Sequence, residues 1–244
     1  MKFLKNHPFA VSAHFERSTV LTFAVPQDQL LSYIPECLEL DTFHDKWAFI
    51  AVAMVQTKDL RPKGTPKFLG NDFFLIGYRI FVRYKTSYGK RLRGLYIIKS
   101  ETNKKKMEFF GNIFTHYNYT TTDIRLLERN GIRSFSSSKS NFLLEIDITE
   151  NEVELPMGSP FSEWKEARRF AGPLPFTFTY NSEDNSVLII EGVRSNWKPK
   201  AINVSEYQFE FLDNLPFDNI VLANAFEIND IPYYWKKGKK DLWN

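Results

Sequence analysis

Three consecutive lysines at positions 104–106 stand directly before an apolar helical pattern. Such a cluster could supply a reactive amine, hold an anionic ligand, or form the solvent-exposed start of a helix. Exposed lysines keep pKa values of about 10, so they are mostly protonated and poorly nucleophilic. Cations in the first turn also oppose the helix dipole by roughly 0.3–1 kcal/mol, a cost that solvent exposure reduces. We therefore expect a solvated basic edge, with an anion site as the alternative.

The helix that follows the lysines has one predicted apolar face. Met107, Phe110 and Phe114 recur at intervals of three and four residues, which is the spacing of one side of an α-helix. Thr102 or Asn103 is the expected N-cap, because their side-chain oxygens can accept a hydrogen bond from a free backbone N–H group.

The spacing of the histidines and the cysteine count indicate no metal-binding motif. The four histidines, His7, His14, His44 and His116, form neither an H-x-x-x-H nor an H-x-H pair, so a metal would need ligands from distant strands. Cys37 is the only cysteine, which excludes an intrachain disulfide and zinc motifs built on two or more thiols. We expect no metal and no cofactor.

Several function classes lack their signatures. The phosphate-binding patterns G-x-G-x-x-G and G-x-x-x-x-G-K-[ST] are absent, as is the G-x-S-x-G nucleophile elbow. The net charge of +3 is a mild basic excess, and the basic runs at 104–106 and 236–240 flank no aromatic stripe for nucleic acid. The longest apolar run, 47–55, is shorter than the ~20 residues of a membrane helix, and the start lacks a signal-peptide core. We expect a cytoplasmic protein with no nucleic-acid or membrane partner.

The elements that position these residues are mainly strands. Aromatic residues make up 16% of the chain, which favours strands, cores and ligand cavities. Alternating patterns predict strands at 18–26, 37–43, 46–57, 73–86, 91–101, 117–126, 132–138, 141–149, 176–180, 186–193 and 207–211. Helices are predicted at 27–34 and at 159–172, the latter with Ser159 as N-cap and Gly172 as its end. Without repeats or linkers, residues 1–244 are expected to form a single domain, with 236–244 a mobile basic tail.

A family resemblance supports this β-rich interpretation. The run FAVPQDQLLSYIPECLELDTFHDKWAFIAVAMVQTKDLRP, followed by GYRIFVRYK, GLYIIKSET and THYNY, resembles the YqjF-like family of uncharacterised bacterial proteins. The resemblance spans most of the chain, from residue 15 to 235, and is best between 18 and 120. That family is similar in fold to acetoacetate decarboxylase. The resemblance therefore implies a mainly β fold, a cone-shaped antiparallel β-barrel with a few short helices around an internal apolar cavity.

The resemblance also bears on chemistry. In the decarboxylase, a Phe-Pro-Lys-Lys segment supplies a Schiff-base lysine that a cationic neighbour or desolvation activates. The matching stretch here is NIFTHYNY, in which His116 and Tyr117 stand where the lysine pair would be. The resemblance therefore implies that the reactive amine is missing, and Schiff-base decarboxylation is disfavoured.

Four residues are the candidate ligand-binding set. A neutral imidazole at His116 could act as acid, base or hydrogen-bond donor, which makes it the candidate catalytic residue, and the alternative is a structural histidine bonded to a neighbour. Arg79 matches the family's strand arginine and needs either an anionic ligand or an acidic partner, for which Glu101 is the candidate. With Tyr117, these residues are expected to approach a cavity for an apolar or carboxylate-bearing small molecule. The other open function is a non-catalytic structural or interaction protein with a filled barrel.

Overall fold

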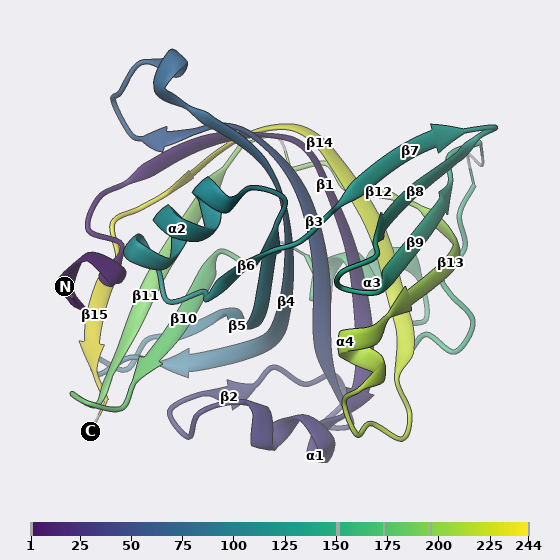
Figure 1. Ribbon diagram of the computed structural model, residues 1–244. Helices are drawn as coiled ribbons and strands as arrows, with labels where there is room; N and C mark the ends of the chain where they lie inside the picture. Colours follow the sequence, from purple (N-terminus) through teal and green to yellow (C-terminus); the bar gives the residue numbers. More distant parts are fainter. Residues whose placement is uncertain (1, 150–151, 173, 196, 244) are drawn as a thin grey trace.

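The computed structural model describes residues 2–149, 152–172, 174–195 and 197–243. The predicted mainly β fold with short helices is confirmed, and the strands form two sheets (Figure 1). The larger sheet closes on itself because β14 pairs with β1 on one side and with β11 on the other. The seven strands of this ring, in spatial order, are β14 (Val221–Trp235), β1 (Val11–Pro26), β3 (Trp47–Pro62), β4 (Asn71–Lys85), β5 (Arg91–Thr102), β10 (Phe176–Asn181) and β11 (Ser186–Arg194).

Short strands extend the ring, and a second sheet packs against its outer face. The short strands are β2 (Glu39–Leu40), β6 (Tyr119–Thr121), β12 (Lys200–Ala201) and β15 (Lys239–Leu242). The second sheet contains, in order, β13 (Asn203–Phe209), β9 (Phe142–Asp147), β8 (Ile132–Ser137) and β7 (Arg125–Arg129). Ring centroids of Phe209 and Tyr78 lie 6.3 Å apart, and those of Phe135 and Phe74 lie 5.7 Å apart. Because successive strand residues point to opposite faces, β4 directs Phe74 and Tyr78 to the second sheet and Arg79 into the ring.

Seven short helical elements surround the sheets in the described ranges. They are the 3₁₀ turns η1 (Lys2–Asn6), η2 (Leu31–Tyr33) and η3 (Lys67–Leu69), and the α-helices α1 (Gln27–Leu30), α2 (Lys105–Phe114), α3 (Trp164–Phe170) and α4 (Glu210–Asp213). The helix predicted after the lysines is confirmed as α2, and residues 104–106 are exposed. Its predicted N-cap is wrong: Lys104 takes that position without a side-chain bond, because the Asn103 side chain accepts the backbone N–H of Phe74 at 2.8 Å.

Several predicted boundaries are also wrong. The helix expected over 159–172 covers only Trp164–Phe170, with Glu163 at the N-cap position. The Ser159 hydroxyl accepts the Phe161 N–H at 3.2 Å and donates to the Ala223 carbonyl at 2.7 Å, in a segment that precedes the helix. The single strand expected at 117–126 is two strands in different sheets, β6 and β7. The strand expected through 211 ends at Phe209, where α4 follows.

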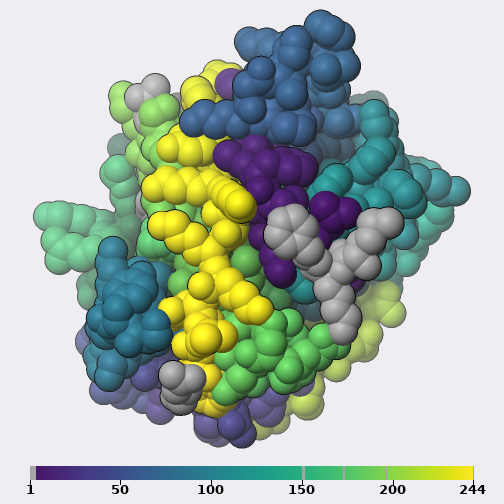
Figure 2. All heavy atoms as spheres, turned by 90° about the vertical axis from the view of Figure 1, so that its left-hand side faces the viewer, coloured from purple at the N-terminus to yellow at the C-terminus, as the bar shows by residue number. Residues whose placement is uncertain are grey.

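The described residues of the segment 236–244, for which the sequence suggested a mobile tail, include the strand β15, and residue 244 lies outside the described ranges. Among them, β15 pairs antiparallel with β11, and Figure 2 shows this yellow segment lying against the green strands of the ring. The carboxylate of Asp241 accepts the Tyr84 hydroxyl at 2.7 Å and the Ser87 hydroxyl at 2.6 Å. These contacts hold the segment on the sheet despite its basic composition.

Candidate functional site

A cavity of about 120 Å³, here called the inner chamber, lies within the ring. All seven ring strands contribute side chains to it, and residues that follow α3, such as Leu174, close one side. Its lining residues with polar side-chain atoms are Ser18, Arg79, Ser100, Tyr117, Tyr119, Thr177, Arg194, Trp197, Tyr233 and Trp235. No Asp, Glu or Lys lines the chamber in the described part of the chain. The chamber therefore combines apolar walls with hydrogen-bond donors and two guanidinium groups.

Arg79 of β4 is the predicted site residue that the chamber contains most clearly. Its side chain folds back over Gly77, where an added Cβ would lie 2.9 Å from the Arg79 Nε atom. That Nε is buried without a hydrogen-bond partner. The glycine thus makes room for a guanidinium whose Nε donor has no partner among the described residues.

Arg194 supplies the second guanidinium, opposite Tyr233 in the pairing of β11 with β14. Its guanidinium carbon lies 4.2 Å from the centroid of the Trp197 ring, and burial lowers its pKa. Tyr233 is the register partner of Arg194 and fits over Gly192, where an added Cβ would lie 1.8 Å from the Tyr233 hydroxyl oxygen. The pairing of β11 with β14 therefore places the Arg194 guanidinium and the Tyr233 phenol at the chamber wall.

Three tyrosine hydroxyls are associated with the chamber. Burial raises the pKa of Tyr119 to about 12 and also raises the pKa values of Tyr117 and Tyr233, which the positive charge of Arg79 only partly offsets. All three phenols are therefore protonated at neutral pH. They offer O–H groups to a ligand. They do not act as bases, because only the deprotonated phenolate form could accept a proton.

The structure separates the four residues that the sequence grouped. Arg79 and Tyr117 line the chamber, whereas Glu101 and His116 do not. Glu101 does not pair with Arg79, because it lies on the other face of β5, where it contacts the Lys99 ammonium at 3.3 Å and accepts the Ser140 hydroxyl at 2.5 Å.

His116 lies outside both the chamber and the larger pocket described below. Its Nε2 atom is 3.1 Å from the side-chain oxygen of Asn6, so it has the neighbouring partner of a structural histidine. Burial, and to a lesser degree the charge of Lys5, lower its pKa. At neutral pH its ring is therefore uncharged.

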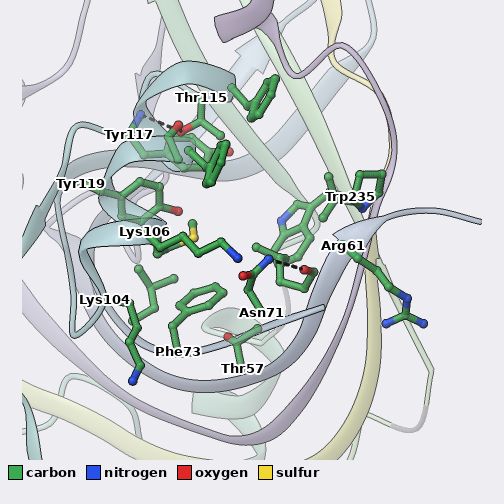
Figure 3. A pocket seen from close by; sticks show the side chains of 18 of the residues that line it. Thr57, Arg61, Asn71, Phe73, Lys104, Lys106, Thr115, Tyr117, Tyr119 and Trp235 are labelled. Atoms are coloured by element: carbon green, nitrogen blue, oxygen red, sulfur yellow. Dashed lines mark hydrogen bonds between the residues drawn. The ribbon is translucent and has the colours of Figure 1, made fainter. Parts of the chain in front are cut away.

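A larger cavity of about 630 Å³, here called the outer pocket, lies between α2 and the ends of β3, β4 and β14 (Figure 3). Its walls are mostly apolar and include Phe9, Val11, Leu60, Phe73, Met107, Phe110, Phe114 and Trp235. The predicted apolar face of α2 thus faces this pocket. Leu75, Tyr117, Tyr119 and Trp235 border both cavities and form the partition between them.

Lys104, the residue before α2, and Lys106, in its first turn, lie at the rim of the outer pocket and outside the chamber. Lys106 extends across the pocket toward Asn71, whereas Lys104 and Arg61 point away from its centre (Figure 3). Both lysines are exposed, as predicted for a basic edge. Among the described residues, no group of three or more His, Cys, Asp or Glu side chains could hold a metal ion.

The sequence interpretation missed several residues of the chamber. Tyr119 could have been found, because it follows Tyr117 at a spacing of two. Arg194 directly follows the predicted strand 186–193, but nothing local indicated that its side chain faces a cavity. Tyr233 belongs to β14, which was not predicted. The pairing of β14 with β11, which brings Tyr233 next to Arg194, therefore carried no signal in the sequence.

Solved structures that share this architecture include decarboxylases. An acetoacetate decarboxylase from Legionella pneumophila matches with a TM-score of 0.63 and 12% identity, over 96% of this chain and 87% of that chain. A second acetoacetate decarboxylase gives a TM-score of 0.58 and 11% identity, over 95% and 89% of the two chains. The enduracididine biosynthesis enzyme MppR gives 0.56 and 9%, over 96% and 90%.

The ring and its chamber thus define a protein with the acetoacetate-decarboxylase-like fold, as predicted. Within that class, the chain belongs to the DUF2071 family, described as an uncharacterized conserved protein, whose match covers residues 12–228 and is consistent with the YqjF-like resemblance. No curated protein matches the chain in sequence. In the ranges that the structure describes, no helix has the length and apolar character needed to cross a membrane.

Proposed function

We propose that this protein binds a small carboxylate-bearing molecule in the inner chamber. The observation that carries the proposal is that Arg79 and Arg194 line one cavity with no acidic side chain among its described lining residues. A partly buried cation without a counter-ion is still costly, so a chamber that two such guanidinium groups line is suited to an anion. The planar guanidinium matches a carboxylate in particular, because it can donate two parallel hydrogen bonds.

Other arginines that contact the interior have carboxylate partners. Asp41 is fully buried and lies 2.6 Å from both Arg83 and Arg93. Arg133 lies 2.6 Å from the carboxylate of Glu227 between the two sheets. The protein thus neutralises guanidinium groups where they serve the fold, and this contrast supports a ligand-binding role for those of the chamber.

The remaining chamber groups favour binding of an anion over proton abstraction. Arginine stays charged at neutral pH, and the raised pKa values of Tyr117, Tyr119 and Tyr233 keep their phenols protonated. The titratable side chains that line the chamber in the described ranges are therefore all donors. A general base for catalysis would need an acceptor, so the proposal is one of binding and orientation.

The names of the structural relatives agree with this ligand class. Acetoacetate decarboxylase is named for a small carboxylate, and the MppR structure is a complex with pyruvate, which is another. The likeness to these proteins is one of fold alone. Because no lysine lines the chamber in the described part of the chain, Schiff-base chemistry is not part of the proposal.

Isothermal titration calorimetry with propionate and its uncharged analogue propionamide tests the proposal. We expect Arg79→Met and Arg194→Met each to weaken propionate binding about tenfold or more, since a charge-assisted hydrogen bond contributes about 1.5–3 kcal/mol. Arg91→Met, on the same sheet but exposed and outside the chamber, is the matched control and should bind as the unaltered protein does. Propionamide should bind at least tenfold more weakly. Absence of propionate binding would favour the structural or interaction role.

A further inference from the structure

We infer that the carboxylate ligand is amphipathic, with its anionic head in the inner chamber and an extended alkyl or aryl-alkyl body in the outer pocket. This inference rests on the proposed function and specifies its substrate class. A volume of about 120 Å³ admits only a few heavy atoms, since one water molecule occupies about 30 Å³ of liquid. The chamber therefore suits a head group.

The outer pocket has the size and chemistry for the rest of such a molecule. Its volume of about 630 Å³ lies within the range of about 300–1,000 Å³ that is usual for small-molecule sites. Phe73 and Phe114 on its wall, with the Met107 thioether, offer apolar contacts that gain free energy by covering hydrocarbon. A pocket of this kind binds apolar chains more strongly than compact polar acids.

The two cavities adjoin through a shared partition. Leu75, Tyr117, Tyr119 and Trp235 border both of them, so a molecule whose carboxylate is in the chamber directs its next atoms past these side chains. The aromatic rings of the partition can pack on a hydrocarbon chain, while the tyrosine hydroxyls remain available to the head group. The arrangement thus matches a single amphipathic ligand that spans the partition.

The charges at the pocket also set the orientation of the ligand. The guanidinium groups lie in the chamber, whereas the lysines at 104 and 106 are exposed at the rim of the outer pocket. A carboxylate at the rim would stay close to water, where an exposed ion pair contributes little. A carboxylate in the chamber meets Arg194 and the buried Nε of Arg79, both less exposed than the rim lysines, so the head is placed inward.

Calorimetric titration with propionate, and with octanoate below its micelle concentration, tests this inference. Each methylene buried in an apolar site is worth about fourfold in affinity, so octanoate should bind at least tenfold more tightly than propionate. Phe110→Ser, which removes a ring from the outer pocket, should weaken octanoate about tenfold and leave propionate within twofold. Phe109→Ser is the matched control, because Phe109 is the next residue of α2, is 63% exposed and does not line the pocket.

The possible failures are distinguishable. If propionate binds through Arg79 but octanoate binds no more tightly, or if both phenylalanine variants weaken octanoate equally, the amphipathic ligand is refuted while the proposed function stands. If octanoate binding is insensitive to Arg79→Met, octanoate binds through its hydrocarbon part only, and the placement of its carboxylate in the inner chamber is wrong. If neither acid binds, the proposed function fails, and this inference fails with it.

Discussion

Replacing Arg79 with methionine should increase the stability of the ligand-free protein. The Arg79 Nε atom is buried without a partner, and no carboxylate lines its cavity in the described ranges. A buried donor without an acceptor costs about 1–3 kcal/mol. Methionine occupies similar space over Gly77 without a donor, so the free energy of unfolding should rise by about 1–3 kcal/mol. For a chain of this length the gain corresponds to roughly 2–12 °C in Tm.

Urea unfolding of the ligand-free protein measures this change, and Arg133→Met provides the contrast. Arg133 hydrogen-bonds the carboxylates of Glu128 and Glu227, the latter at 2.6 Å. Its loss should reduce the free energy of unfolding by about 1.5–3 kcal/mol, because the buried carboxylate of Glu227 loses a charged donor. If Arg79→Met is destabilising to the same degree, Arg79 has a partner within the protein, and the argument for an anionic ligand fails.

Two further predictions concern the stability of the fold. Burial lowers the pKa of His7, so below about pH 6.5 the unfolded chain binds a proton that the folded chain does not, and stability falls as the pH decreases. His7→Gln should therefore lose less stability between pH 7.5 and pH 5.5 in urea unfolding, and an equal loss would show that His7 is not the group responsible. Deleting residues 239–244 removes β15 and the hydrogen bonds of Asp241 to Tyr84 and Ser87, which should cost at least about 2 kcal/mol. A Tm unchanged by the deletion would mean that the segment is the mobile tail after all.

The strands that were predicted correctly carry their signal locally. The hairpin of β4 and β5 alternates aromatic and β-branched residues around the turn residues of SYGK, so propensity and pattern agree with the final fold. The face of α2 was likewise predicted from spacing alone. The long strand β14 was not, because VLANAFEINDIPYYW contains Asn229, Asp230 and Pro232, which favour turns. Its extended conformation depends on pairing with β1 and β11, and those partners are distant in sequence.

The candidate site was half predicted for a related reason. Arg79 was found because a strand arginine needs a partner, but the identity of that partner depends on which face of β5 Glu101 occupies. A register irregularity between Tyr78 and Arg79 makes that face hard to read from spacing alone. In the structure Glu101 lies on the same face of β5 as Lys99, and Arg79 lines the chamber without an acidic partner among its described lining residues.

Tyr117 lines the cavities and the adjacent His116 does not, because of the geometry of the segment after α2. Chain that leaves a helix in an extended conformation alternates its side chains between two faces, so adjacent residues point to opposite sides. Thr115 is extended, with φ of −139° and ψ of 167°, and the following His116 meets Asn6 outside the cavities while Tyr117 lines both of them. An alignment to a lysine pair names two adjacent positions but does not say which one faces inward. In this chain the inward position holds a phenol, which donates a hydrogen bond as an amine would but forms no Schiff base, and a chamber of donors is what a bound carboxylate requires.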